Sequence, residues 1–292
     1  MTIFSKEVTI YKFSVITSNG FPYYQLKVKD APNGIKQYLR FFDFSKEELK
    51  PQSDFEIADS FELNAGLVSA LFKFARAMSK NINILEFNSD EQADIQNDHG
   101  NYSGDVLVTC QTESYLFHKS VYAKIKLIYD VLLSYKVPLE SAIEILPVQE
   151  EKIYNILTDF DARSRVAEHK TQLKRLGSDF LKEMKNYGLR EICITSFDLS
   201  PIMILGKKYS LDDVHGILRN IGNIPEIPPL NWVYRQSIHD SEEIWVYVYK
   251  SDVGPSIEGL FEPYLYLLIC DFNSYLGEIP EVLGNKLNRI LS

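Results

Sequence analysis

Residues 190–221, REICITSFDLSPIMILGKKYSLDDVHGILRNI, carry the pattern that decides the fold class. A β-branched run is followed by a turn at 198–201 and a second apolar run, which predicts a hairpin. Ser210 is a suitable N-cap for the helix that follows, and Asp212 and Asp213 suit its positive N-terminal end. The helix has one narrow apolar stripe, made of Val214, Ile217, Leu218 and Ile221.

Downstream of this helix, three aromatic and β-branched runs predict strands: NWVYRQSIH (231–239), EIWVYVYK (243–250) and residues 264–272. A short helix, EIPEVLGNKLNRIL (278–291), closes the chain. The last part of the chain therefore reads β-β-α-β-β-β-α.

The first half follows the same plan. Residues 8–29 read as a hairpin around Ser18-Asn19-Gly20, because Asn-Gly is the strongest short hairpin signal. We expect a polar, irregular stretch up to Ser60, a helix at 64–78, strands at 82–88 and 105–113, and a loop at 89–104 between them. A helix at 119–136 ends before Pro138. The order is β-β-α-β-β(-β)-α, with the place of a fifth strand left open.

The helix at 64–78 has an apolar face wider than one sheet surface needs. One stripe contains Leu67, Leu71, Phe74 and Met78, and a second contains Val68, Phe72 and Ala75. Val68 and Phe72 are therefore candidate interaction residues. The alternative is that they pack against another helix of this chain.

The length of 292 residues is about twice the commonest domain size, so two domains are expected. We predict an α/β (α+β) fold with a first domain at 1–146, a helical connector at 147–189 and a second domain at 190–292. Each domain is expected to hold an antiparallel five-stranded sheet with flanking helices.

The connector has one apolar seam and one basic face. The seam contains Val166, Leu173, Leu176, Phe180, Met184 and Tyr187, and Gly188 is a natural stop. The basic face contains Arg163, Arg165, Lys170, Lys174 and Arg175. In an acidic protein this local positive field is a candidate binding surface for an acidic partner or lipid headgroups. The alternative is a solvated helix face paired with Asp161 and Glu168.

The composition narrows the function class. A net charge of −9 argues against a general nucleic-acid binder. The 3 cysteines are far apart in strand-like runs, which suggests neither a disulfide framework nor a zinc site. The N-terminus does not resemble a signal peptide, and no apolar run approaches the length of a membrane span. We therefore expect a cytoplasmic protein with at most peripheral membrane contact.

No residue pattern predicts catalysis. The segment 206–209 has a Gly-Lys pair but lacks the upstream glycine and the Ser/Thr of a P-loop. Cys110 and His118 form the one conceivable thiol–base pair, without a nucleophile-turn signature. The other histidines are scattered. We predict that the chain is not an enzyme and has no catalytic, cofactor-binding or metal site.

The plan resembles the roadblock/longin superfamily. The residues that carry the resemblance are Ser18-Asn19-Gly20-Phe21-Pro22-Tyr23-Tyr24, which are similar to the family's strand–Gly-x-Pro–strand opening. The helix segment 65–71, AGLVSAL, is similar to the family's small-residue-rich first helix, and Leu199-Ser200-Pro201-Ile202 stands at the second hairpin. The stretch before the helix and the loop at 89–104 depart from the compact family pattern.

The resemblance implies two longin-like domains in one chain, each with helices around an antiparallel sheet of strand order 2-1-5-4-3. It further implies a non-catalytic adaptor or regulator that binds a small Ras-like GTPase or another longin or roadblock protein. Trafficking-like or GTPase-regulating complexes, and pairing into dimers, belong to the same implication. The alternative is a PAS- or GAF-like small-molecule sensor or scaffold, because its element order is similar.

Overall fold

The computed structural model describes residues 8–17, 22–44, 106–134 and 145–292, together with 69, 70, 73 and 76. Its contacts divide the chain into two compact units, one of residues 1–45 and 103–292 and one of residues 46–102. In the second unit Ser69, Ala70, Lys73 and Arg76 are helical and exposed, in agreement with the polar side of the predicted helix. Val68, Phe72, the turn at 18–20, the strand at 82–88 and the loop at 89–104 lie outside the described residues.

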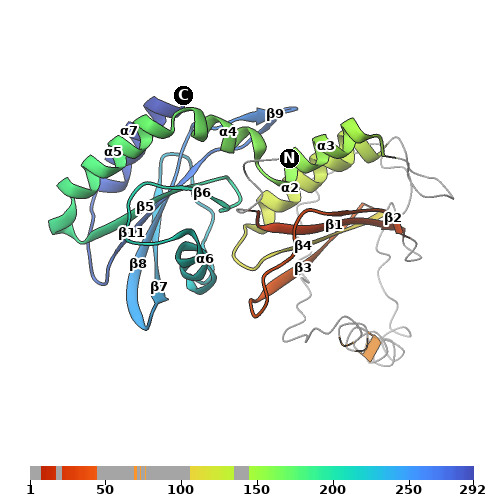
Figure 1. Ribbon diagram of the computed structural model, residues 1–292, viewed down its shortest axis with the longest axis horizontal. Helices are drawn as coiled ribbons and strands as arrows, with labels where there is room; N and C mark the ends of the chain where they lie inside the picture. The colour runs from red at the N-terminus through yellow and green to blue at the C-terminus, as the bar shows by residue number, and fades with distance from the viewer. Residues whose placement is uncertain are drawn as a thin grey trace, which may run out of the picture. The chain divides into compact units, whose positions relative to one another are not determined.

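Among the described residues, the larger unit contains two large antiparallel sheets and one two-stranded sheet (Figure 1). The first has the order β2-β1-β4-β3, with β1 (Ile10–Thr17), β2 (Pro22–Lys27), β3 (Gln37–Asp43) and β4 (Val106–Glu113). The second has the order β6-β5-β11-β8-β7, with β5 (Leu189–Thr195), β6 (Pro201–Ile204), β7 (Trp232–His239), β8 (Glu242–Lys250) and β11 (Leu265–Asp271). A short hairpin joins β9 (Ser256–Ile257) to β10 (Leu260–Phe261). The chain is thus a mixed α+β protein with antiparallel sheets.

The second sheet has the strand order that the sequence resemblance implies. When β9 and β10 are set aside and the other strands are numbered along the chain, the order is 2-1-5-4-3. The last strand, β11, occupies the centre, where it pairs with both β5 and β8. Its residues are almost all buried, as expected for a strand covered on both faces.

Strand β3 corrects the prediction of an irregular stretch up to Ser60. Gln37–Asp43 pairs with β4 over its whole length, from Gln37 opposite Glu113 to Asp43 opposite Leu107. Arg40 and Phe42 are buried, whereas Leu39 and Phe41 are exposed. The side chains of β3 therefore point alternately to the buried and to the exposed side of the sheet. The strand was hard to recognise in the sequence because one of the buried residues, Arg40, is charged.

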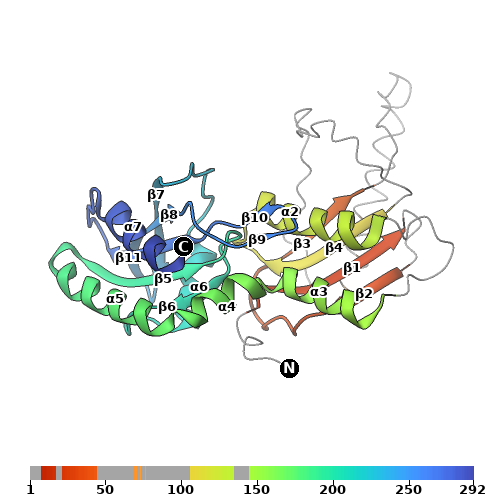
Figure 2. The ribbon, with the colours of Figure 1, turned by 90° about the horizontal axis from the view of Figure 1, so that it is seen from above.

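Two helices lie on one face of the first sheet (Figure 2). They are α2 (His118–Ile128), which continues as a π-helix over Tyr129–Leu133, and α3 (Pro147–Leu157). Phe44 stacks on Tyr129 with a centroid distance of 4.3 Å, and Phe42 contacts Tyr122. The predicted apolar stripe of α2 is confirmed, because Val121, Ile125, Ile128 and Leu132 are buried.

Helices cover both faces of the second sheet. On one face α5 (Lys170–Glu183) and α7 (Ile279–Leu291) enclose a core with Tyr247, Tyr249 and Leu268. On the other face lies α6 (Leu211–Asn220), whose Ile217 carbonyl accepts a hydrogen bond from Ser237 of β7 at 2.7 Å. Ser210 and Asp213 form a capping box at the start of α6, which confirms the predicted helix start.

The predicted connector is not one long helix. It consists of α3, α4 (Phe160–Glu168), α5 and a short 3-10 turn at Lys185–Tyr187. Asp159, with φ of 54°, separates α3 from α4, and Gly188, with φ of 79°, ends the segment. The apolar seam in the sequence begins at Val166, after this residue, so it gives no sign of the break at Asp159.

Candidate functional site

The predicted basic face of the connector is only partly on the surface. Lys170, Lys174 and Arg175 are exposed on α5, and Arg165 is half-buried on α4. Arg163 departs from the prediction, because its side chain is buried with 1% exposure. The proposed interaction role of the other four residues stays a prediction.

Arg163 is buried because its guanidinium satisfies carbonyl and hydroxyl oxygens inside the protein. It donates to the Thr158 carbonyl at 2.8 Å, the Pro201 carbonyl at 3.0 Å and the Ser200 hydroxyl at 2.9 Å. Arginine suits this position because its planar fork holds several donors in fixed directions. It therefore fastens α4 to the turn between β5 and β6.

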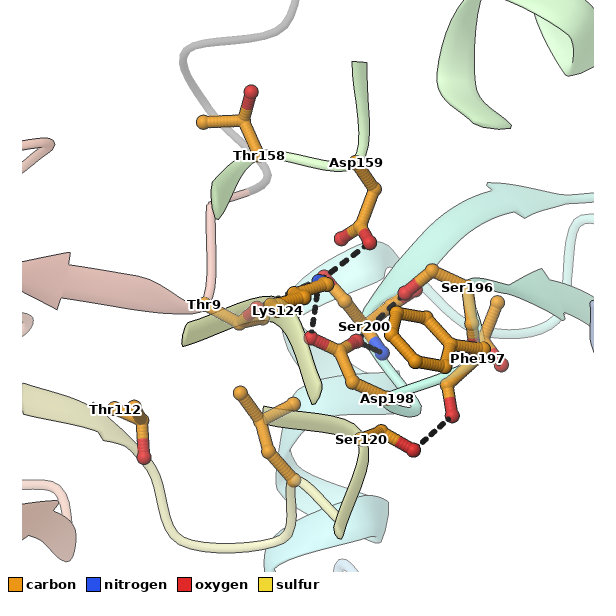
Figure 3. A network of polar contacts seen from close by, with 12 residues as sticks. Thr9, Thr112, Ser120, Lys124, Thr158, Asp159, Ser196, Phe197, Asp198 and Ser200 are labelled. Atoms are coloured by element: carbon orange, nitrogen blue, oxygen red, sulfur yellow. Dashed lines mark hydrogen bonds and ion pairs between the residues drawn. The ribbon is translucent and has the colours of Figure 1, made fainter. Parts of the chain in front are cut away.

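A buried charge network surrounds this contact and links the two sheets (Figure 3). Nζ of Lys124, on α2, lies 2.5 Å from a carboxylate oxygen of Asp159 and 2.6 Å from one of Asp198, and all three side chains are buried. Asp198, in the β5–β6 turn, also accepts hydrogen bonds from the Ser196 hydroxyl and the Ser200 backbone. Because Lys124 belongs to the first sheet's helices and Asp198 to the second sheet, the network holds the sheets together.

A second polar contact joins the sheets at β4. The buried carboxylate of Glu113 accepts two hydrogen bonds from Arg219 of α6, at 2.9 and 2.6 Å, and one from the Tyr11 hydroxyl at 2.5 Å. Nearby, the Tyr115 hydroxyl lies 2.7 Å from Nδ1 of His215. We call this set and the charge network together the intersheet junction. Sequence reasoning missed it, because residues that bond across it, such as Thr9 and Ser200, are as many as 191 positions apart.

The electrostatics of the junction depend on burial. Burial acts to raise the pKa of Asp198, but Lys124 and the hydrogen bonds outweigh it and hold the pKa below its usual value. For Asp159, burial and the neighbouring Asp198 prevail over Lys124 and raise the pKa to about 6. Perturbed pKa values of this kind occur at functional sites and also in structural ion-pair networks. The side chains of Lys124, Asp159 and Asp198 are fully enclosed, which is the geometry of a buried ion-pair network.

The thiol–base pair considered from the sequence does not form an activated nucleophile. Cys110 is buried, and burial raises the pKa of its thiol, so the reactive thiolate is suppressed. Nδ1 of His118 lies 3.3 Å from Nη1 of Arg40, and burial together with this cation lowers the pKa of the imidazole. Within the described ranges, no group of three or more potential metal ligands occurs and no helix could cross a membrane.

An aromatic surface lies along β7, the edge strand of the second sheet. We call it the β7 aromatic surface; it contains Trp232, Tyr234, Trp245 and Phe272. Tyr234 stacks on Trp245 with a centroid distance of 4.9 Å, and Trp245 meets Phe272 edge to face at 6.1 Å. Tyr234 is 44% exposed and Phe272 43% exposed. Exposed aromatic clusters with an apolar body and a polar tip are typical of protein interfaces.

A shallow hollow of about 360 Å³ lies beside this surface and is lined by Trp232, Val233, Tyr234 and Arg235. Four consecutive strand residues point alternately to both faces of the sheet, so the hollow follows the outer edge of β7. Two side chains cover carbonyls on this strand: Arg235 donates to the Tyr234 carbonyl and Asn220 to the Ile238 carbonyl. The alternating run WVYRQSIH predicted the strand, but its edge position required the structure.

Comparison with known proteins gives no relative: no protein-family model matches the chain, and no curated protein matches it either.

Proposed function

We propose that this protein is a non-catalytic adaptor or regulator that binds a small Ras-like GTPase or another longin-type protein, in a complex that regulates GTPases or trafficking. The observation that carries the proposal is the 2-1-5-4-3 order of the second sheet, with α6 on one face and α5 and α7 on the other. That arrangement is the one implied by the resemblance to the roadblock/longin superfamily. A fold alone does not specify a function, so the proposed binding contact is located from the side chains at the surface.

The first sheet supports the same interpretation. Its order, β2-β1-β4-β3, also places the last strand beside the first and the second strand at the edge. The helices α2 and α3 cover one of its faces, as α5 and α7 cover one face of the second sheet (Figures 1 and 2). Two antiparallel sheets that each have a pair of helices on one face would suit an adaptor that brings proteins together.

The chemistry of the described residues also favours binding over turnover. The ionisable groups Lys124, Asp159, Asp198, Glu113 and Arg219 of the junction pair with one another inside the protein. The β7 aromatic surface, in contrast, exposes large side chains to solvent. We place the partner's contact on this surface, because buried aromatic anchors supply most of the energy of protein interfaces.

Binding to purified Ras-like GTPases tests the proposal. The immobilised full chain is presented with a panel of such GTPases, each loaded with GDP or with a non-hydrolysable GTP analogue. We expect one or more to bind with a Kd in the micromolar range or below. If no GTPase binds in either nucleotide state, the proposed function is wrong.

Variants locate the contact. Tyr234→Ala and Phe272→Ser remove exposed aromatic groups, and we expect each to weaken binding at least tenfold, the size of a typical hot-spot truncation. Tyr187→Ala is the matched control, since Tyr187 is 57% exposed on a different element. Binding that persists unchanged in both surface variants would place the contact elsewhere.

A further inference from the structure

Glu262 is a buried carboxyl group in the link between β10 and β11. Its side chain is 1% exposed. The backbone on both sides is held: the Glu262 amide donates to the Pro255 carbonyl at 2.9 Å, and the Tyr264 amide donates to the Val253 carbonyl at 3.0 Å. Gly254 packs so closely that an added Cβ would lie 2.0 Å from the Glu262 carbonyl oxygen. The residue is therefore held in the interior by its backbone.

The carboxyl group has no donor to stabilise a negative charge. In the part of the chain that the structure describes, neither Glu262 oxygen has a hydrogen-bond partner. Buried carboxylates are normally paired or hydrogen-bonded, because transferring an uncompensated charge from water into a protein interior is very unfavourable. This geometry favours the neutral acid.

The charges around Glu262 lead to the same conclusion. The groups that act on its carboxyl are Lys124 of α2, Asp159 between α3 and α4, Asp161 of α4, Asp198 of the β5–β6 turn, and the neighbouring Tyr264. The buried cations of this region are Lys124, Arg163 and Arg40, and the last of them acts on Asp198. None of them donates a hydrogen bond to Glu262, so an ionised Glu262 would carry a negative charge without a bonded partner.

We propose that Glu262 is a proton-binding switch of the intersheet junction: its neutral form is compatible with the closed junction, and its ionised form loosens the packing between the two sheets. The ionised carboxylate repels Asp159 and Asp198, which are the groups that bind Lys124. Loss of the proton therefore acts on the contact that holds the sheets together. Burial raises the pKa of Glu262 to about 8, which brings the transition close to neutral pH.

The direction of the pH effect follows from proton binding. The folded-state pKa of Glu262 is raised above the ordinary value of 4.5, so the folded state holds a proton that the unfolded chain releases. Its contribution to stability is complete below about pH 4.5 and is lost as the pH rises through about 8. Asp159 acts in the same direction only up to about pH 6. His118 and His215, with lowered pKa values, act in the opposite direction around and below pH 6.5. Because Glu262→Gln keeps all of these groups, the difference between its profile and that of the wild type isolates Glu262.

Urea unfolding between pH 6.5 and 7.5 tests the proposal. Release of one proton raises the unfolding constant close to tenfold per pH unit, and we expect this rise in the wild type relative to Glu262→Gln. The control is Glu258→Gln. Glu258 lies in the turn between β9 and β10, and its exposed carboxylate pairs with Lys152 of α3. This variant should keep the wild-type profile. Parallel pH profiles of the wild type and Glu262→Gln would overturn the proposal.

A measurement on the wild-type chain covers the case in which Glu262→Gln does not fold. With ¹³C-labelled glutamate, the carboxyl resonances are followed by NMR from pH 4 to 9. We expect one glutamate to titrate near pH 8, well separated from those that titrate near their ordinary pKa. If every glutamate carboxyl titrates below about pH 6, Glu262 is not a proton-binding group and the inference is wrong.

Discussion

Replacing Lys124 by methionine removes the positive charge that two buried carboxylates share. Nζ of Lys124 lies 2.5 Å from Asp159 and 2.6 Å from Asp198, and all three side chains are buried. Methionine keeps most of the side-chain volume and adds no polar atom, so the change tests charge rather than packing. The pKa of Lys124 is raised despite burial, because Asp159 and Asp198 stabilise its charged form, so the cation is present at every physiological pH.

The expected loss is large because the partners stay behind. At an effective dielectric constant of about 20, each contact corresponds to roughly 6–7 kcal/mol of gross attraction. Desolvation of the ions offsets most of that attraction. Removing one member of such a set, however, leaves buried charges uncompensated, which costs about 3–5 kcal/mol. A domain of ordinary stability, about 5–15 kcal/mol, would lose a large part of its total.

The assay is urea unfolding at pH 7 with the midpoint and slope analysed together. Lys126→Met is the matched control on the same helix, because the side chains of the Lys126–Asp130 pair reach the surface, with 26% and 42% exposure, and surface pairs contribute about 0–1 kcal/mol. The double variant Lys124→Met/Asp198→Asn should lose less than the sum of its single changes, since it removes one of the two unpaired carboxylates. A loss below about 1 kcal/mol for Lys124→Met, equal to that of Lys126→Met, would refute the reasoning.

Three further outcomes are expected. Burial lowers the pKa of His215 to about 4, so its ¹H NMR signal should not titrate between pH 6 and 7.5, and its contribution to stability should be lost as the pH falls from about 6.5 towards 4; a titration near 6.5 would contradict the burial seen here. Gly284→Ala places a methyl group 2.4 Å from the Tyr249 ring, and overpacking of this kind should lower the unfolding free energy by about 1–3 kcal/mol; a variant with an unchanged urea midpoint would show that α7 can shift. The thiols of Cys110, Cys193 and Cys270 are all buried, so a thiol reagent should modify them only after unfolding, and rapid modification of the native protein would show that a strand opens.

Sequence reasoning located most of the second sheet and its helices. The capping pattern at Ser210 and the alternating runs at 231–239 and 243–250 correspond to α6, β7 and β8 within one or two residues. These elements were predictable because local chemistry dictates them: a cap satisfies the first amides of a helix, and alternation exposes one strand face. β3 was missed because Arg40, a charged residue, occupies a buried strand position and donates to the Leu116 carbonyl and the Thr112 hydroxyl.

The sequence by itself determined most elements of the second sheet and its helices, since capping and alternation depend on neighbours along the chain. Tertiary structure decided which residues meet. Lys124, Asp159 and Asp198 are separated by dozens of positions in the sequence. Arg163 was predicted for the surface yet is buried, because distant segments such as the one at Pro201 supply the oxygens that accept its hydrogen bonds. The pairing energy of a buried charge depends on distance and solvent access in three dimensions, and neither quantity is written in the order of residues.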